Sequence, residues 1–418
     1  MRKPLTTAKN HAKKIIAYLS RALELDVYYF LTGGFWLILA LAVNSLLALL
    51  VIVAFSYFAT KEIFGQYKFV VTVLSTLAIF SLPGMNLAVM QAASKGKYAA
   101  LVQTTKSRFL YSLLGSLVLL ISAVYLKVRN EDVWYIFVIA AFLFPFLYSF
   151  DGYVSLLLGK KQFSLAALYS SIPQIIISLA VIGAVYFLHT LVWIVLASVI
   201  VTIILHLVFY KKVADQANSK KDPDAVHYGK HLSYMSSLQI VGSQLDKLIV
   251  PYFLGFEQLA VYAIAASLPE GMRNVAKSLS PMLIPKFVKI TGRAVYEKIR
   301  KKIWMVFSAS VAFSIAAIFI SQWLIPLMFS STYAGAVPFA QVMFLALPLE
   351  FASMIFLTML KAYKKVKVLY WYYSLLACVS LILFVILTPK FGLMGACIAR
   401  VITSYISGIQ LWFSAKKL

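Results

Sequence analysis

Long apolar stretches alternate with short polar segments along almost the whole chain of 418 residues. A helix of about 20 mostly apolar residues is long enough to cross the hydrocarbon core of a bilayer. Twelve segments have this length and character, so the pattern predicts an all-α, polytopic membrane protein. The segments lie near residues 34–58, 67–90, 108–126, 133–158, 162–188, 190–210, 231–254, 259–285, 302–328, 335–360, 368–388 and 392–414.

The longest polar stretch, KKVADQANSKKDPDAVHYGK (211–230), separates the first six segments from the last six. Two stretches in matching places, YFATKEIFGQY (57–67) and YFLGFEQLAVY (252–262), share Tyr, Phe, Glu and Tyr in the same spacing. Six is an even number, so both halves start from the same side of the membrane. The pattern predicts two parallel repeats, a construction in which transporters bind substrate between the halves.

This division gives four parts. They are an amphipathic amino-terminal segment suited to the membrane interface (1–30), a first six-helix lobe (31–210), a linker (211–230) and a second six-helix lobe (231–418).

The net charge of +25 follows the predicted topology. Most of the 39 Lys and Arg residues fall in the two termini and in alternate loops, whereas the facing loops hold few. Lys and Arg accumulate on the cytoplasmic side of a membrane. We therefore expect both termini to be cytoplasmic, in the inner (cytoplasmic) membrane of the cell. The basic residues then face anionic lipid headgroups, and nucleic acid is not needed to explain them.

Little in the chain suggests catalysis. Cys378 and Cys397 lie inside apolar runs, which indicates neither a disulfide framework nor a metal site. The five His residues form no metal-ligand pattern, and no phosphate-binding glycine loop is present in the sequence. The predicted outer loops are too short to carry the active site of a membrane glycosyltransferase or polymerase. We expect neither an enzyme nor a cofactor.

Ionisable residues inside the predicted spans need an explanation, because each costs roughly 2.5–3.5 kcal/mol at the centre of a membrane helix. Asp246 and Lys247 stand side by side in the middle of the seventh segment. Consecutive residues point about 100° apart on a helix, so each of the two needs a partner on another helix. The other ionisable residues within the spans are Lys68, Asp151, Glu270, Arg273, Lys277, Glu350 and Arg400.

Polar residues recur at helical spacing in several of these segments, which places them on common faces. Such stripes indicate a hydrated cavity, which we expect between the two halves. Interhelical ion pairs and close helix packing are the alternative, and Asp151 and Glu350 are either ion-coupling residues or satisfied structural acids. The stripes are Ser236, Gln239, Ser243 and Asp246; Glu270, Arg273 and Lys277; Arg400, Ser404, Ser407 and Gln410; and Ser171, Gln174 and Ser178.

Three stretches resemble a known family. They are YFATKEIFGQYKFVVTVLSTLAIFSLPGMNLAVMQAASKGK (57–97), SQLDKLIVPYFLGFEQLAVYAIAA (243–266) and LTPKFGLMGACIAR (387–400). The chain resembles polysaccharide or O-antigen flippases, within the multidrug/oligosaccharidyl-lipid/polysaccharide exporter superfamily. One departure is Ala260, where many relatives carry glycine.

The resemblance implies a two-lobed transporter that moves a polyprenyl-pyrophosphate-linked oligosaccharide to the outer leaflet, with coupling to an Na⁺ or H⁺ gradient. Membrane lipids and glycan assembly enzymes are further candidate partners. A pyrophosphate requires cationic surroundings. The candidates are Lys247, Arg273, Lys277 and Arg400 for the anionic substrate; Asn44, Gln174, Gln239, Ser243 and Ser404 for the polar lining; and Asp246, Glu270, Glu350 and Asp151 for ion coupling.

Two other functions within the superfamily stay open. A multidrug antiporter would favour an acidic, aromatic cavity, whereas the basic residues here favour an anionic substrate. An exporter of lipid-linked peptidoglycan precursor is implied to have fourteen helices, against the twelve expected here.

Overall fold

The computed structural model describes residues 27–215, 222–288, 294–363 and 365–416, all of which form helices and short connections. Most of the predicted amphipathic segment 1–30 lies outside this part. The first half of the chain contains α2 (Val27–Phe58), α3 (Lys61–Leu77), η1 (Ala78–Ser81), α4 (Met85–Ser94), α5 (Ala100–Val128), α6 (Trp134–Ser149), α7 (Tyr153–Gly159), α8 (Phe163–Phe187) and α9 (Leu191–Ala214). The second half contains α10 (Pro223–Leu254), α11 (Phe256–Val288), α12 (Ala294–Met328), η3 (Ser331–Ala336), α13 (Val337–Phe344), α14 (Leu347–Ala362) and α15 (Val366–Lys416).

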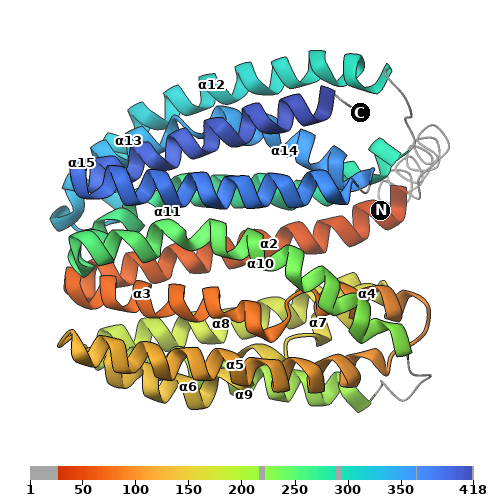
Figure 1. Cartoon of the computed structure of the whole chain (residues 1–418), viewed down its shortest axis with the longest axis horizontal. Coiled ribbons are helices and arrows are strands. Elements are labelled where there is room, and N and C mark those ends of the chain that lie inside the picture. The colour runs from red at the N-terminus through yellow and green to blue at the C-terminus, as the bar shows by residue number, and fades with distance from the viewer. Residues whose placement is uncertain (1–26, 216–221, 289–293, 364, 417–418) are drawn as a thin grey trace, which may run out of the picture.

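Within the described residues, eight helices are long and apolar enough to cross a membrane. A ninth candidate is the pair Ser331–Phe344 and Leu347–Lys361, which is bent by 45°. The prediction of an all-helical, multi-pass membrane protein is confirmed. α10 and α11 are as long as the others, with 32 and 33 residues, but they carry several charges. α15 has 51 residues and turns back on itself at Gly392, where φ is 59° (Figure 1).

The helices of the first half are interrupted at two places. α3 continues into η1 and then stops at Leu82, whose φ of 54° lies in the left-handed region, before Pro83 and the start of α4. α6 ends at Ser149, and α7 begins only at Tyr153. The second interruption leaves Asp151 in a short turn between two helix ends.

The two halves of the chain form two groups of helices that meet along α2, α3, α10 and α11 (Figure 1). At one end of this boundary, Gly65 of α3 lies against the backbone carbonyl of Phe256, and an added Cβ would overlap that oxygen. At the other end, the backbone N–H of Gly84 donates to Ser233 Oγ of α10 at 3.0 Å. Small residues therefore permit close contact between the halves at both places.

The repeated stretches occupy equivalent places in the two halves. α2 ends at Phe58 and α10 at Leu254, and the helix that follows each begins within three residues. Glu62 and Glu257 lie in the first turn of α3 and of α11. Tyr67 and Tyr262, the last shared residues, are both buried. The sequence repeat therefore corresponds to a repeated helix-turn-helix unit.

Candidate functional site

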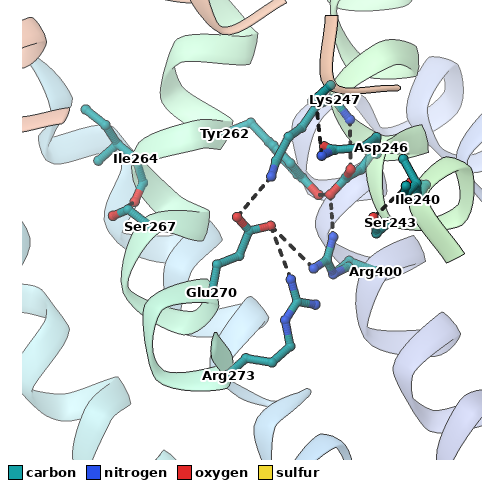
Figure 2. Close-up of polar contacts among 12 residues, drawn as sticks. Ile240, Ser243, Asp246, Lys247, Tyr262, Ile264, Ser267, Glu270, Arg273 and Arg400 are labelled. Atoms are coloured by element: carbon teal, nitrogen blue, oxygen red, sulfur yellow. Dashed lines mark hydrogen bonds and ion pairs between the residues drawn. The ribbon is translucent and has the colours of Figure 1, made fainter. Parts of the chain in front are cut away.

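Six intramembrane charged residues of the second half gather in one place (Figure 2). Four helices supply them, and we call this group the charge cluster. Its members are Asp246 and Lys247 of α10, Glu270 and Arg273 of α11, Glu350 of α14 and Arg400 of α15.

Asp246 and Lys247 point to different partners. Asp246 is 2% exposed, accepts a hydrogen bond from Tyr262 Oη at 2.9 Å and forms an ion pair with the guanidinium of Arg400. Lys247 Nζ reaches Glu270 Oε2 at 2.9 Å (Figure 2). The prediction that each needs a partner on another helix is confirmed.

Glu270 contacts all three basic residues of the charge cluster. Besides Lys247, its Oε1 lies 3.4 Å from Arg400 Nη2 and 3.5 Å from Arg273 Nη2 (Figure 2). The contact with Lys247 has the length of a good hydrogen bond, and the contacts with Arg400 and Arg273 are longer than the usual range for N–H···O. A single carboxylate thus lies where three cationic groups converge.

Glu350 completes the charge balance. Its Oε1 lies 3.4 Å from Arg273 Nη1 and accepts a hydrogen bond from Ser404 Oγ at 2.8 Å. The cluster then holds three carboxylates and three basic groups, so its formal charge is zero. Every cation in it has an acidic partner, because an unpaired charge would be costly in these surroundings.

A cavity of about 430 Å³ adjoins the charge cluster. It is bounded by α10, α11, α14 and α15, so it lies within the second half of the chain. This cavity therefore does not lie between the two halves, where the sequence predicts one. Among its lining residues are Gln239, Ser243, Asp246, Arg273, Glu350, Arg400 and Ser404.

Two buried polar atoms of the cavity lining have no hydrogen-bond partner within the described part of the chain. They are Arg273 Nε and Tyr373 Oη. Tyr373 is only 6% exposed. Buried donors are normally satisfied. These two donors are exceptions to that rule.

The remaining sequence candidates lie elsewhere. Lys277 belongs to α11, but its side chain is outside what the structure describes. Asn44 lies on α2 and has a buried Oδ1 with no partner among the described residues. Gln174 Nε2 donates to Ser178 Oγ on α8 at 3.4 Å. Asn44 and Gln174 belong to the first half and do not join the charge cluster.

A second charged group, in the first half, centres on Arg108 of α5, which is 3% exposed. Its guanidinium pairs with Asp151, and its Nη1 also donates to Asn86 Oδ1 at 2.8 Å. Nε donates to the carbonyl of Ser81 at 3.0 Å, and Nη2 donates to the carbonyl of Tyr148. Arg108 thus binds both helix interruptions of the first half, at the ends of η1 and α6.

Sequence reasoning missed Arg108 because it stands at the start of a predicted span and looked like a loop residue. The available signal was Asp151, an acid with no basic partner in its own span. An unpaired intramembrane acid calls for a basic group on a neighbouring helix. The first basic residue of the preceding apolar segment was the natural candidate.

Comparison with known proteins gives a family and a fold. The family model described as polysaccharide biosynthesis protein matches residues 30–291. No curated protein sequence matches the chain.

Three solved structures share the fold. The lipid II flippase MurJ, in an inward closed conformation, has a TM-score of 0.70 at 15% identity, with 90% of this chain and 87% of that chain covered. A MOP superfamily transporter from Pyrococcus furiosus has a TM-score of 0.63 at 13% identity, with 93% and 95% covered. An outward-facing multidrug resistance MATE family transporter has a TM-score of 0.63 at 12% identity, with 93% and 95% covered.

Proposed function

Because the chain belongs to the polysaccharide biosynthesis protein family and shares the fold of MOP superfamily transporters, we propose that it is a transporter and not an enzyme, and that it flips a polyprenyl-pyrophosphate-linked oligosaccharide. The lipid moves from the inner to the outer leaflet by alternating access. The observation that carries this proposal is the arrangement of Lys247, Arg273 and Arg400 around one carboxylate, beside a cavity.

The proposed topology has twelve spans with both termini in the cytoplasm. The count starts from the eight helices that are long and apolar enough to cross a membrane. The bent pair adds one span, α10 and α11 add two, and the second arm of α15 adds one. An even number places both termini on one side. The distribution of Lys and Arg assigns that side to the cytoplasm of the inner membrane.

The charge cluster suggests how an anion is accepted and released. In the described state the carboxylate of Glu270 lies within 3.5 Å of all three cations. A pyrophosphate carries several anionic oxygens and binds guanidinium groups in a bidentate manner. When H⁺ or Na⁺ neutralises Glu270 or Glu350, the cations are freed for the substrate. When the ion leaves, the carboxylate competes with the pyrophosphate and favours its release. This exchange couples the ion gradient to transport.

The sugar part of the substrate needs hydroxyl and amide partners. Gln239, Ser243 and Ser404 line the cavity and can supply them. Asn44 and Gln174 would reach the oligosaccharide only after the two halves separate, from the side of the first half.

A multidrug antiporter is less well supported by the cluster. A lipophilic cation would gain little from a cluster whose formal charge is zero, because it would have to compete with three basic groups for the carboxylates. In the structure each carboxylate of the cluster is paired.

The experiment that tests the proposed function combines Arg273→Ala with Lys277→Ala in cells that lack their own copy of the transporter. Loss of both cations should abolish surface glycan while the protein stays in the membrane at normal abundance. The matched control is Lys390→Ala, which removes an exposed cation away from the cluster. Normal surface glycan in the double variant would refute an anion-binding role for these residues.

A further inference from the structure

The cavity beside the charge cluster extends along α14 for about three helical turns. Glu350, Met354, Leu357 and Lys361 all line it. They follow one another at intervals of four, three and four residues, which places them on one face of the helix. Eleven residues separate Glu350 from Lys361, which is a rise of about 16 Å at 1.5 Å per residue. The cavity therefore has the charge cluster toward one end and Lys361 toward the other.

The second arm of α15 lines the cavity in the same direction. Arg400, Ser404, Ser407 and Leu411 follow one another along it toward the end of the chain. Because α15 turns back at Gly392, its last turns lie on the same side of the molecule as its first turns, which come just after Lys361 (Figure 1). In the topology proposed above, this is the cytoplasmic side. Lys361 is also the last residue of the bent candidate span, so the cavity extends from the charge cluster toward the cytoplasmic surface.

Three basic residues line the described cavity, and two of them are already paired. Arg273 and Arg400 contact the carboxylates of the charge cluster. Lys361 is exposed, and no carboxylate among the described residues forms an ion pair with it. An anion that enters the cavity in this state can therefore bind Lys361 without displacing an acidic partner.

Hydroxyl groups line the path between the two ends of the cavity. The hydroxyls of Tyr372 and Ser407 form a hydrogen bond of 2.6 Å, and both residues line the cavity. Ser404, about one turn of α15 nearer to the cluster, donates to Glu350 at 2.8 Å. A polar group that moves from Lys361 toward the cluster thus passes side chains that form hydrogen bonds.

We propose that Lys361 is a docking residue for the pyrophosphate of the substrate, which it holds at the cytoplasmic end of the cavity before the anion moves about 16 Å to the charge cluster. This inference rests on the proposed function. In the exchange mechanism, Arg273 and Arg400 accept the anion only after H⁺ or Na⁺ neutralises a carboxylate. Lys361 binds it beforehand, because its charge-assisted hydrogen bond to a phosphate oxygen needs no such step.

Lys361 also has a structural role, because it lies in the last turn of α14. A basic side chain there interacts favourably with the helix dipole. This role affects the stability of α14 and does not involve the cavity, so by itself it predicts no change in anion binding. Pyrophosphate affinity, measured beside thermal stability, therefore distinguishes the docking role from the structural one.

The first test measures equilibrium binding of inorganic pyrophosphate to the full-length protein in phosphatidylcholine nanodiscs. Lys361→Gln should weaken binding about tenfold, because it removes one charge-assisted hydrogen bond. The matched control is Lys367→Gln, which removes an exposed lysine six residues further along the chain that does not line the cavity. Unchanged affinity in a folded Lys361→Gln variant, or an equal loss in the control, would overturn the docking role.

The second test locates the anion by protection of a thiol. Lys361→Cys is made in a Cys378→Ser background, because Cys378 is exposed whereas Cys397 is buried. Polyprenyl pyrophosphate should slow the reaction of the introduced thiol with 2-aminoethyl methanethiosulfonate several-fold, whereas phosphatidylglycerol at the same mole fraction should not. The attached aminoethyl group returns the positive charge and should restore pyrophosphate affinity. Absence of protection, or equal protection by both lipids, would refute the docking role.

The outcome for Lys361 is separate from the test of the proposed function. If Lys361 fails these tests while the Arg273→Ala, Lys277→Ala variant loses surface glycan, the docking role falls and the flippase proposal stands. If the double variant keeps normal surface glycan, the anion-binding role of the cluster fails. Weaker pyrophosphate binding in Lys361→Gln would even then support an anion site at the cytoplasmic end of the cavity.

Discussion

The most direct test of the exchange mechanism is Glu270→Gln. This change keeps the size of the side chain and removes its charge, so the formal charge of the cluster rises from zero to +1. Lys247, Arg273 and Arg400 then lose the carboxylate that they share. If that carboxylate occupies the site between the basic groups where the substrate pyrophosphate binds, the variant should bind anions more tightly and release them more slowly.

The expected magnitude follows from the distances. A unit charge at about 4 Å is worth about 4 kcal/mol at an effective dielectric constant near 20. Glu270 is 22% exposed, and two of its three contacts are 3.4 Å or longer, which reduces the effect. We therefore expect a gain of about 1.4–2.8 kcal/mol in anion binding, which is about 10- to 100-fold in Kd. The lost ion pairs should at the same time destabilise the fold by about 1.5–3 kcal/mol.

The assay compares equilibrium binding of inorganic pyrophosphate to wild type, Glu270→Gln and the control Glu62→Gln, which removes an acid from the first turn of α3. Surface glycan is measured in parallel and should fall in Glu270→Gln only, because a tightly held anion is not released. The reasoning is refuted if a folded Glu270→Gln variant binds pyrophosphate no better than wild type. It is also refuted if transport continues at the normal rate.

Three further predictions concern structural contacts. Asp246→Asn should lower the amount of protein in the membrane more than the transport rate per molecule, since it weakens the ion pair of a buried carboxylate by about 1.5–3 kcal/mol; immunoblots and surface glycan separate the two effects. Arg108→Leu should cost about 3–5 kcal/mol, because it removes the basic partner of Asp151 and the donor to two backbone carbonyls, and adding Asp151→Leu should restore only the part due to the carboxylate, as thermal unfolding of the single and double variants will show. Gly65→Ala should lower the Tm or force the halves apart, because its Cβ meets a backbone carbonyl of α11, whereas Gly183→Ala should be neutral in the same measurement.

The sequence predicted the helical, multi-pass architecture because a membrane span is a run of about 20 mostly apolar residues, which can be recognised along the chain. It also predicted the repeat of α2–α3 in α10–α11 and the separate partners of Asp246 and Lys247. The first follows from residues shared by two stretches, and the second follows from helical geometry. These features are local, so they can be worked out without knowing how the helices pack.

What the sequence could not provide depends on packing between distant helices. Glu270 joins three basic residues because α10, α11 and α15 converge, and nothing in the spacing of Arg400 indicates that neighbourhood. The cavity lies within one half because α10, α11, α14 and α15 surround it, and Gly65 and Gly84 let the two halves make direct contact elsewhere. Helical stripes show which residues share a face, but they do not show which neighbour that face meets.

The course of α10 has a mechanical consequence. Its first turns are held by the first half, through Ser233 and the contact of Gly229 with Met85, while its later turns pack against α15 in the second half. One continuous helix therefore contacts both halves. Under the alternating access proposed above, a tilt of the halves relative to each other would bend α10 or break one of these contacts, and Gly242, in the middle of the helix and without a side chain, would resist bending least. The helix that carries Asp246 and Lys247 would then bend in each transport cycle.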